Sequence, residues 1–417
     1  MRSRGFTLAA AALLAGAGLA APASASAAAP AEAGKAAPGL TNTATFNEPP
    51  GGKIVLHLVD MIENAEPGST ILFTAFRFEE AAVANALVDA SRSRGVKVKL
   101  LVDGGATEAD SQVFERVKQA FEEDGNSETW AKECWRPPHP AMPNGPPYHS
   151  CQGTGAMHNK FVLFTKTKGA SYVVSTGSAN LRKSSGTNAW NSWYTHVGNA
   201  DLYKRYADYF TAMAGMRERL DYYNEDPPKL TGNIKSYFYP RAPVEGDAYA
   251  NDTVAHTLEA TGCPGKIRIA NWSLTRSTTA KWLVKKAASG CTVEIIVSKM
   301  HGAACLPLVQ AAELGYPVRM WSYEQGAPNY VHTKDMMIEA PYPNTTQQAK
   351  VVFTGSANFN RPSLEQNDEN VLRIMNDDLV YGAFVENFNN IKNHVETSGQ
   401  GFQIKNVQDC ERAYPQG

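Results

Sequence analysis

The sequence repeats itself, and this duplication restricts the fold more than any other feature. In the first copy, an apolar strand, an Ala-rich helix and a second strand are expected over 71–76, 79–92 and 96–102. In the second copy, the same three elements are expected over 267–272, 278–288 and 292–297. Gly95 and Gly290 stop the two helices at matching places. A strand–helix–strand unit implies parallel pairing with a right-handed crossover, so each copy predicts an α/β half.

The N-terminus has the pattern of an export signal. Arg2 and Arg4 precede a short apolar run over 6–20, and small residues that suit a cleavage site follow it. We therefore expect a signal peptide over 1–27, a disordered Ala/Pro/Gly-rich lead-in over 28–44, and a secreted protein. A retained membrane anchor is the alternative, but the apolar run is short for a membrane span.

Two halves follow the lead-in. We place the first half at 45–225 and the second at 232–410, with Asp226-Pro227-Pro228 between them. The chain has 417 residues, of which 43% are hydrophobic, and this is enough apolar material to give each half a buried core.

The cysteine count predicts three disulfides. The chain has six cysteines, and an even count in an exported protein favours complete pairing. One pair would bracket a Pro-rich loop, a second would join the starts of two neighbouring strands, and the third remains by elimination. The expected pairs are Cys134–Cys151, Cys263–Cys291 and Cys305–Cys410. No Cys-x-x-Cys pair or His/Cys cluster in the sequence suggests a structural zinc site.

The duplication extends to residues that can carry chemistry. Each half contains His-x-Lys, followed by Thr-Gly-Ser-Ala-Asn. The candidate residues are His158, Lys160, Ser178 and Asn180 in the first half, and His332, Lys334, Ser356 and Asn358 in the second. A single His-x-Lys is usually a solvated strand edge, and a single Gly-Ser-x-Asn is usually an ordinary turn. Both motifs occurring twice, in the same order on a repeated scaffold, indicate a functional site.

These residue types suit a phosphate centre. Side chains two apart on a strand share a face, so each histidine should lie beside its lysine. An imidazole can attack phosphorus or donate a proton, while an ammonium neutralises the phosphate oxygens. Gly177 and Gly355 should allow close backbone approach, and the serines and asparagines offer donors for the non-bridging oxygens.

At these motifs the chain resembles the phospholipase D superfamily, whose pattern is His-x-Lys-x4-Asp followed by Gly-Ser-x-Asn. The resemblance covers roughly 45–393, and Phe46-Asn47-Glu48-Pro49 is similar to that family's entry segment. It implies an α/β fold of two similar α/β/α sandwich halves, related by a pseudo-two-fold axis around one shared active site. It also implies a phosphohistidine intermediate on one histidine, proton donation by the other, and no metal or cofactor.

The sequence departs from the family pattern at two kinds of position. The family's aspartate is replaced by Thr165 and Glu339, which puts in doubt hydrogen bonds that often join the halves. Glu369 stands eleven residues after Asn358, where relatives often hold a His-orienting carboxylate, but the matching position in the first half is Asn191. If each partner supports the histidine of its own half, Glu369 keeps His332 protonated as the acid. His158, beside a neutral amide, would then be the nucleophile.

Charge and aromatic content bear on the substrate. The chain has 40 Lys and Arg against 41 Asp and Glu, whereas proteins that bind long polyanions usually carry a basic surplus. Aromatic segments at 130–148, 190–194 and 321–330 flank the motifs and would suit a membrane–water interface. Ordinary packing at the mouth of the domain explains them equally well, and stacking on nucleic acid bases is a further possibility.

The sequence therefore predicts a secreted, monomeric phospholipase D that hydrolyses the head-group phosphodiester of glycerophospholipids. Its partners would be phospholipid at a membrane or micelle interface and water or an alcohol as acceptor, with nucleic acid less favoured. A secreted nuclease on the same fold is the second hypothesis. A non-catalytic binding module is the third, although two complete His-x-Lys sets argue against it.

Overall fold

Two mixed β-sheets carry the fold, and each is assembled largely from one copy of the sequence repeat. The computed structural model describes residues 39–105, 108–138, 145–345 and 348–414. The expected signal peptide at 1–27 and the lead-in up to residue 38 lie outside the described residues. Residues Gly39–Gly417 form one compact unit.

The strands of the first sheet run in the order β1-β7-β6-β5-β2-β3-β4, and β13 also pairs with β7. Their bounds are β1 (Thr43–Asn47), β2 (Thr70–Ala75), β3 (Lys97–Asp103), β4 (Trp130–Cys134), β5 (Phe161–Thr167), β6 (Ala170–Gly177), β7 (Ala189–His196) and β13 (Tyr330–Val331). The expected lead-in at 28–44 thus overlaps the start of β1.

The strands of the second sheet run in the order β17-β12-β11-β10-β14-β15-β16-β9-β8. Their bounds are β8 (Lys229–Thr231), β9 (Ile234–Tyr239), β10 (Gly265–Leu274), β11 (Cys291–Met300), β12 (Val318–Tyr323), β14 (Lys334–Pro341), β15 (Gln348–Gly355), β16 (Glu369–Met375) and β17 (Gly401–Ile404).

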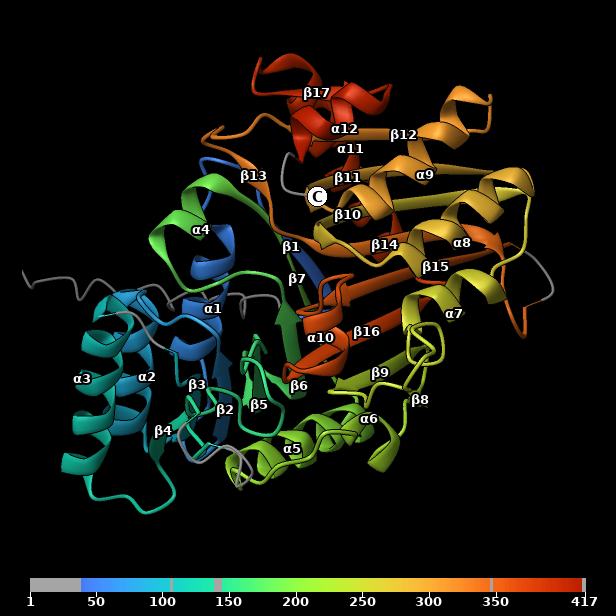
Figure 1. Cartoon of the computed structure of the whole chain (residues 1–417). Coiled ribbons are helices and arrows are strands. Elements are labelled where there is room, and N and C mark those ends of the chain that lie inside the picture. Colours follow the sequence, from blue (N-terminus) through green and yellow to red (C-terminus); the bar gives the residue numbers. More distant parts are fainter. Residues whose placement is uncertain (1–38, 106–107, 139–144, 346–347, 415–417) are drawn as a thin grey trace, which may run out of the picture. The chain divides into compact units, whose positions relative to one another are not determined.

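Helices flank both sheets (Figure 1). Their bounds are α1 (Lys53–Glu63), α2 (Ala81–Arg94), α3 (Glu108–Asp124), α4 (Lys183–Asn188), α5 (Ala200–Ala214), α6 (Tyr222–Glu225), α7 (Thr253–Ala260), α8 (Ser277–Ala288), α9 (Gly302–Glu313), α10 (Arg361–Glu365), α11 (Asp378–Thr397) and α12 (Val407–Ala413). Figure 1 shows α1, α2 and α3 beside the first sheet and α7, α8 and α9 beside the second. No helix in the described part of the chain is long and apolar enough to cross a membrane.

The predicted repeat units are confirmed. Strands β2 and β3 pair in parallel across α2, and β10 and β11 pair in parallel across α8. Gly95 ends α2 in the left-handed conformation at φ 63°, which a glycine adopts without the steric cost that a Cβ brings. The order β7-β6-β5-β2-β3-β4 is matched, strand for strand and in direction, by β16-β15-β14-β10-β11-β12. The two similar halves expected from the sequence are therefore present.

A shared hydrophobic core joins the halves. Helix α5 packs on the first sheet and also against β9, while α11 packs on the second sheet and also against β1. Aromatic rings dominate the contacts: Tyr209 stacks on Phe238 at 4.4 Å between ring centroids, and Phe46 meets Phe384 edge-on at 5.1 Å. Because this core contains side chains from both halves, neither sheet buries its inner face alone.

The aromatic segments expected to form an interfacial ring contribute mainly to this packing. Trp190, Trp193, Tyr194, Trp321 and Tyr323 are all buried. The indole N–H of Trp190 donates to the hydroxyl of Tyr323 at 2.7 Å, which satisfies the polar end of that ring inside the protein. Those five rings are therefore unavailable to a membrane, and the expectation of an aromatic ring at a membrane surface is wrong for them.

The three expected disulfides are all formed. Cys134 pairs with Cys151, Cys263 with Cys291, and Cys305 with Cys410. The second pair joins the segment before β10 to the start of β11, and the third ties α9 to α12 near the C-terminus.

Candidate active site

The two His-x-Lys motifs occupy equivalent places immediately before β5 and at the start of β14. His158, Lys160, His332 and Lys334 are all buried, with 2–9% of their surfaces exposed. Each lysine folds back in the same way: Lys160 Nζ donates to the carbonyl of His158, and Lys334 Nζ to the carbonyl of His332, both at 2.6 Å. The duplication therefore places each lysine beside its own histidine.

Each histidine is held by a residue of the opposite half. Nδ1 of His158 lies 2.9 Å from the Glu369 carboxylate at the start of β16. Nδ1 of His332 lies 2.9 Å from Oδ1 of Asn191 in β7. The expectation that each partner supports the histidine of its own half is therefore wrong. Strand β7 of the first half meets the His332 motif, and β16 of the second half meets the His158 motif. Each half therefore supplies the partner for the histidine of the other half.

The Glu369 carboxylate and the His158 imidazole form a buried hydrogen-bonded pair. Burial lowers the pKa of His158 to about 4, although Glu369 opposes this shift and Lys160 adds to it. Burial alone would raise the pKa of Glu369, but His158 and Lys160 hold that pKa below its ordinary value. Glu369 is consequently an anion at neutral pH and accepts the Nδ1 proton of His158, so Nε2 of His158 faces away from the carboxylate.

Cations from both halves act on the second histidine. Burial lowers the pKa of His332 well below its ordinary value, and Lys334, Lys160 and His158 lower it further. Burial likewise lowers the pKa of Lys160 to about 7 and that of Lys334 well below its usual range. A bound phosphate diester would oppose all of these shifts, because an anion stabilises the charged forms.

The two motif serines support the histidine partners and do not face a phosphate. The Ser178 hydroxyl donates to Asn191 Oδ1 at 2.9 Å, and the Ser356 hydroxyl donates to Glu369 Oε2 at 2.6 Å. A hydroxyl has one proton to donate, and in both cases that proton is already used. The expected phosphate-binding role is therefore corrected to a positioning role for Ser178 and Ser356.

Asn180 and Asn358 remain candidates for contact with phosphate. Their side-chain Oδ1 atoms are buried without a hydrogen-bond partner within the described residues. Because an amide oxygen and a phosphate oxygen are both acceptors, a contact with phosphate would come from the Nδ2 groups of these two amides. Close approach by the preceding glycines is confirmed, because a Cβ on Gly177 would lie 2.2 Å from the Ser192 carbonyl oxygen and one on Gly355 2.3 Å from that of Asn370.

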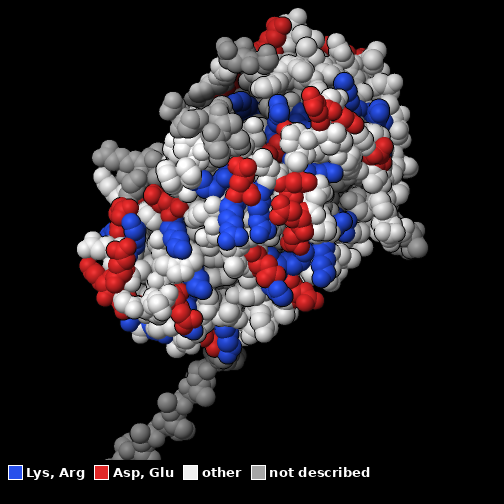
Figure 2. Space-filling view, turned by 60° about the horizontal axis from the view of Figure 1, so that its bottom comes forward, with Lys and Arg blue, Asp and Glu red and all other residues white. Residues whose placement is uncertain are grey.

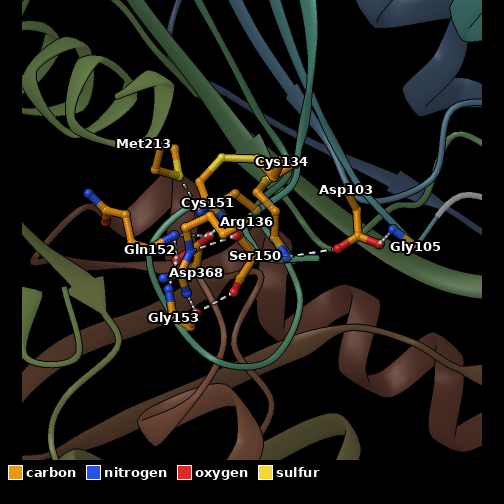
Figure 3. Close-up of a disulfide and its surroundings, with 12 residues drawn as sticks. Asp103, Gly105, Cys134, Arg136, Ser150, Cys151, Gln152, Gly153, Met213 and Asp368 are labelled. Carbon is orange, nitrogen blue, oxygen red and sulfur yellow. Dashed lines mark hydrogen bonds between the residues drawn. A yellow bond between two sulfur atoms is a disulfide. The ribbon is translucent and has the colours of Figure 1, made fainter. Parts of the chain in front are cut away.

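A segment of the first half, residues 150–157 and here called the strap, lies against 366–369 of the second half (Figure 3). The Asp368 carboxylate accepts hydrogen bonds from the backbone N–H groups of Cys151, Gln152 and Gly153, at 2.6–3.3 Å. Backbone bonds then link His158 N–H to the Asp368 carbonyl and Asp368 N–H to the Ala156 carbonyl. The strap thus joins the residue before Glu369 directly to His158.

Steric and covalent constraints fix the strap. A Cβ on Gly153 would lie 1.9 Å from the Gln366 carbonyl oxygen, and one on Gly155 would lie 2.2 Å from Oδ1 of Asn367. The Cys134–Cys151 disulfide ties the strap to the end of β4. This support was not predicted from the sequence, although Asp368 stands directly before Glu369.

Polar contacts behind the site also join the halves. Asn370 Oδ1 accepts from Thr176 at 2.8 Å, and its amide donates to Asn159 Oδ1 at 2.9 Å. Asp335 accepts from the Ser192 hydroxyl of the first half at 2.8 Å. The two positions that lack the family aspartate lie elsewhere: Thr165 accepts from Thr70 N–H and Glu339 from the Tyr381 hydroxyl, each within its own half.

Aromatic rings flank both histidines. The ring of Phe76 lies 4.7 Å from that of His158. Trp272 and Tyr330 lie 6.0 Å and 6.1 Å from His332. Phe76 and Trp272 are the last residues of the two strands predicted from the repeat, which is a signal that could have identified them.

The family model described as "Cardiolipin synthase, PLD-like domain" matches residues 58–214 and 258–392, which is most of the chain. The chain belongs to this family. No curated protein matches the sequence significantly.

Solved structures show the same fold for this PLD-like chain. Phosphatidylserine synthase from Haemophilus influenzae Rd KW20 is similar with a TM-score of 0.56 and 13% identity, over 88% of each chain. Polyphosphate kinase from Porphyromonas gingivalis has a TM-score of 0.55 and 13% identity, over 88% of this chain and 49% of the kinase. The chain thus spans about half the length of that kinase, and at these identities the likeness concerns the fold alone.

Anion binding should be accompanied by proton uptake. The pKa of Lys160 is about 7 in the free protein, and a bound anion raises it, so a fraction of a proton is taken up on binding at about pH 8. Sulfate is a suitable probe because it does not titrate near neutral pH. Isothermal titration calorimetry in two buffers of different ionisation enthalpy measures the uptake. Lys160→Arg, which stays charged, should reduce it, and a binding heat independent of buffer would contradict this prediction.

The strap disulfide should matter more for activity than for stability. The disulfide between Cys134 and Cys151 joins residues 17 positions apart in the sequence, and the one between Cys305 and Cys410 joins residues 105 positions apart. Replacing either pair by alanine opens the corresponding loop. Loop entropy predicts a loss of about 3 kcal/mol for the first pair and about 4–5 kcal/mol for the second. For kcat on bis(p-nitrophenyl) phosphate we expect the larger loss from the first pair. Replacing Cys134 and Cys151 should lower kcat by about tenfold or more, and replacing Cys305 and Cys410 should not. Urea unfolding and kinetics on both variants check this, and equal loss of kcat would refute it.

Proposed function

We propose that this PLD-like chain is a secreted phosphodiesterase that hydrolyses the head-group phosphodiester of glycerophospholipids through a phosphohistidine. The crossed pairing of His158 with Glu369 and His332 with Asn191 carries the proposal. It gives two imidazoles, each oriented through Nδ1, near two lysines that can supply positive charge. A site of this kind can stabilise a phosphoryl centre electrostatically and provide both a nucleophile and an acid.

His158 is assigned as the nucleophile. Its Nε2 lone pair attacks phosphorus, the bond from phosphorus to the leaving-group oxygen breaks, and His332 Nε2 gives its proton to that oxygen. Water then attacks phosphorus, His332 takes the water proton, and the phosphorus–nitrogen bond breaks. The covalent intermediate places a positive charge on the His158 ring, and the Glu369 carboxylate at 2.9 Å neutralises that charge.

This assignment agrees with the sequence-based hypothesis but rests on a different physical reason. The carboxylate was expected to hold the acid protonated, whereas it contacts the other histidine. Asn191 Oδ1 also accepts from Ser178, and its amide donates to the Ser185 carbonyl at 3.1 Å, so its oxygen is directed at His332. His332 must therefore gain its acidic proton when the anionic substrate binds and raises its pKa.

The leaving group distinguishes the two histidines. p-Nitrophenolate departs without a proton, so a variant that lacks only the acid should still form the phosphoenzyme from a p-nitrophenyl diester. We expect His332→Asn to keep a burst of p-nitrophenol and to lose most turnover of alkyl diesters, whereas His158→Asn loses both. Rapid quench and peptide mapping locate the phosphate. Phosphate on the peptide that contains His332, with none on His158, would reverse the roles.

Three observations support lipid as the substrate class. The family model is described by a phospholipid enzyme. The chain has no basic surplus, with 40 Lys and Arg against 41 Asp and Glu. On the face drawn in Figure 2, basic and acidic side chains are interspersed and form no continuous basic band. Burial of five of the expected interfacial aromatic residues weakens the fourth support, so a nuclease on the same scaffold remains the competing function.

One assay separates these functions. Purified protein in excess EDTA is given phosphatidylglycerol vesicles, phosphatidylcholine vesicles and single-stranded DNA. Because lysines supply the charge neutralisation, we expect activity to persist in chelator and lipid turnover to exceed DNA cleavage, while His158→Asn is inactive on all three. Activity lost in EDTA and restored by zinc or calcium would sink the phosphohistidine mechanism. Faster cleavage of DNA would establish the nuclease, and no turnover of any diester would indicate a binding module.

A further inference from the structure

The segment that carries His332 is held between the two sheets. Strand β13 pairs with β7, with Tyr330 opposite Ala189 and Val331 opposite Trp190. On its other side, the Ser298 hydroxyl of β11 bonds both the N–H and the carbonyl of Val331, at 2.8 Å and 2.9 Å. Tyr330 and His332 are therefore fixed next to the end of β11, where Lys299 follows Ser298.

The end of β10 completes this surface. The backbone N–H of Trp272 donates to the backbone carbonyl of Thr333 at 2.9 Å, and this bond places the Trp272 side chain beside His332. The Trp272 ring is half-buried, as is Tyr330. Two aromatic rings thus flank the histidine that is assigned to the leaving group, whereas one, Phe76, flanks the nucleophile.

The same surface is strongly cationic. Lys299 Nζ lies 6.0 Å and Lys334 Nζ 5.9 Å from the centre of the Trp272 ring. Lys299 is exposed, and no carboxylate among the described residues lies within ion-pair distance of it. Besides burial, which is the largest cause, Lys334 and Lys160 lower the pKa of His332 by their positive charge.

We propose that Trp272, Tyr330 and Lys299 form the subsite for the departing head group, and that they select a head group bearing a second phosphate over a quaternary ammonium. This inference rests on the proposed lipid phosphodiesterase and on the role of His332 in it. Aromatic rings alone would also suit trimethylammonium through cation–π contact. Here the exposed ammonium of Lys299 lies at the Trp272 ring, and a bound anion favours the charged form of Lys334 there as well. A cationic head group would therefore meet repulsion, and an anionic one would gain attraction.

The spacing fits such a head group. The Trp272 ring lies 6.0 Å from the His332 ring and 6.0 Å from the Lys299 ammonium. The His332 ring and the Lys299 ammonium therefore lie no farther apart than the sum of these two distances, a gap that a short polyol can bridge. Lys299 acts here through direct contact with the substrate and has no part in the chemical step.

The test uses short-chain phospholipids below their micelle concentration, so that the charge of a lipid surface plays no role. The substrates are dihexanoyl esters of phosphocholine, phosphoglycerol and phosphoinositol phosphate, with the dinucleotide pTpT as the nucleic acid arm. The variants are Lys299→Gln and, as a control of equal charge change, Lys266→Gln, an exposed lysine at the opposite end of β10.

We expect kcat/KM to be at least about tenfold higher for the phosphoinositol phosphate ester than for the choline ester. Lys299→Gln should lower that ratio by about three- to tenfold through KM, and Lys266→Gln should leave it unchanged. Equal or better turnover of the choline ester, or an equal effect of Lys299→Gln on both lipids, would overturn the proposal. A kcat/KM for pTpT above that of every lipid would assign the subsite to nucleic acid and would also overturn the proposal.

Bis(p-nitrophenyl) phosphate separates this inference from the proposed function. Turnover of that diester by the wild-type protein and by Lys266→Gln, and its loss in His158→Asn, would show a working phosphodiesterase whatever the head-group ratio. A wrong ratio with intact diester turnover would reject the subsite alone. No turnover of that diester would reject the proposed function itself.

Discussion

The crossed support of the two histidines is the interaction on which the rest of the structure depends. Neither half contains a complete site, because the Nδ1 partner of His158 comes from β16 and that of His332 from β7. A buried imidazole without a partner on Nδ1 would be poorly oriented and costly to bury. Docking of the halves therefore satisfies both rings at once. The need for that docking explains why α5 and α11 each pack against a strand of the opposite half.

Docking buries many polar groups, and several of them, such as Asp368 and Asn370, have specific partners in the opposite half. Asp368 is fully buried, and burial raises its pKa to about 7 although three backbone N–H groups and Arg136 oppose the shift. Low-dielectric surroundings strengthen satisfied hydrogen bonds and penalise unsatisfied ones, so such a network tolerates little displacement. The strap and its disulfide hold this network in register with His158. Rigidity around the nucleophile is thus obtained from buried polar contacts, while the hydrophobic core shared by the halves contributes apolar burial.

The differences between the halves are as informative as their similarity. A carboxylate supports one histidine and an amide supports the other, so the same fold gives two imidazoles with different electrostatic surroundings. The flanking groups differ in the same sense: one aromatic ring stands beside His158, and two rings with an additional lysine stand beside His332. A duplicated scaffold can perform an asymmetric reaction only if its copies diverge at such positions.

Local patterns in the sequence determined the repeat units, the helix stops such as Gly95, the close approach at Gly177 and Gly355, and the residue types of the site. Those features depend on neighbours along the chain or on covalent chemistry, and the three cysteine pairs could be inferred from strand positions and elimination. The sequence could not decide which half supplies Glu369 to which histidine, that Ser178 and Ser356 face their positioning partners, or that Trp190 and Trp321 lie in the core. These outcomes depend on how two sheets dock, and docking brings together residues about 200 positions apart, such as His158 and Glu369 at a separation of 211. Periodicity and spacing describe one segment at a time, so only the tertiary structure could decide which surfaces of the two halves meet.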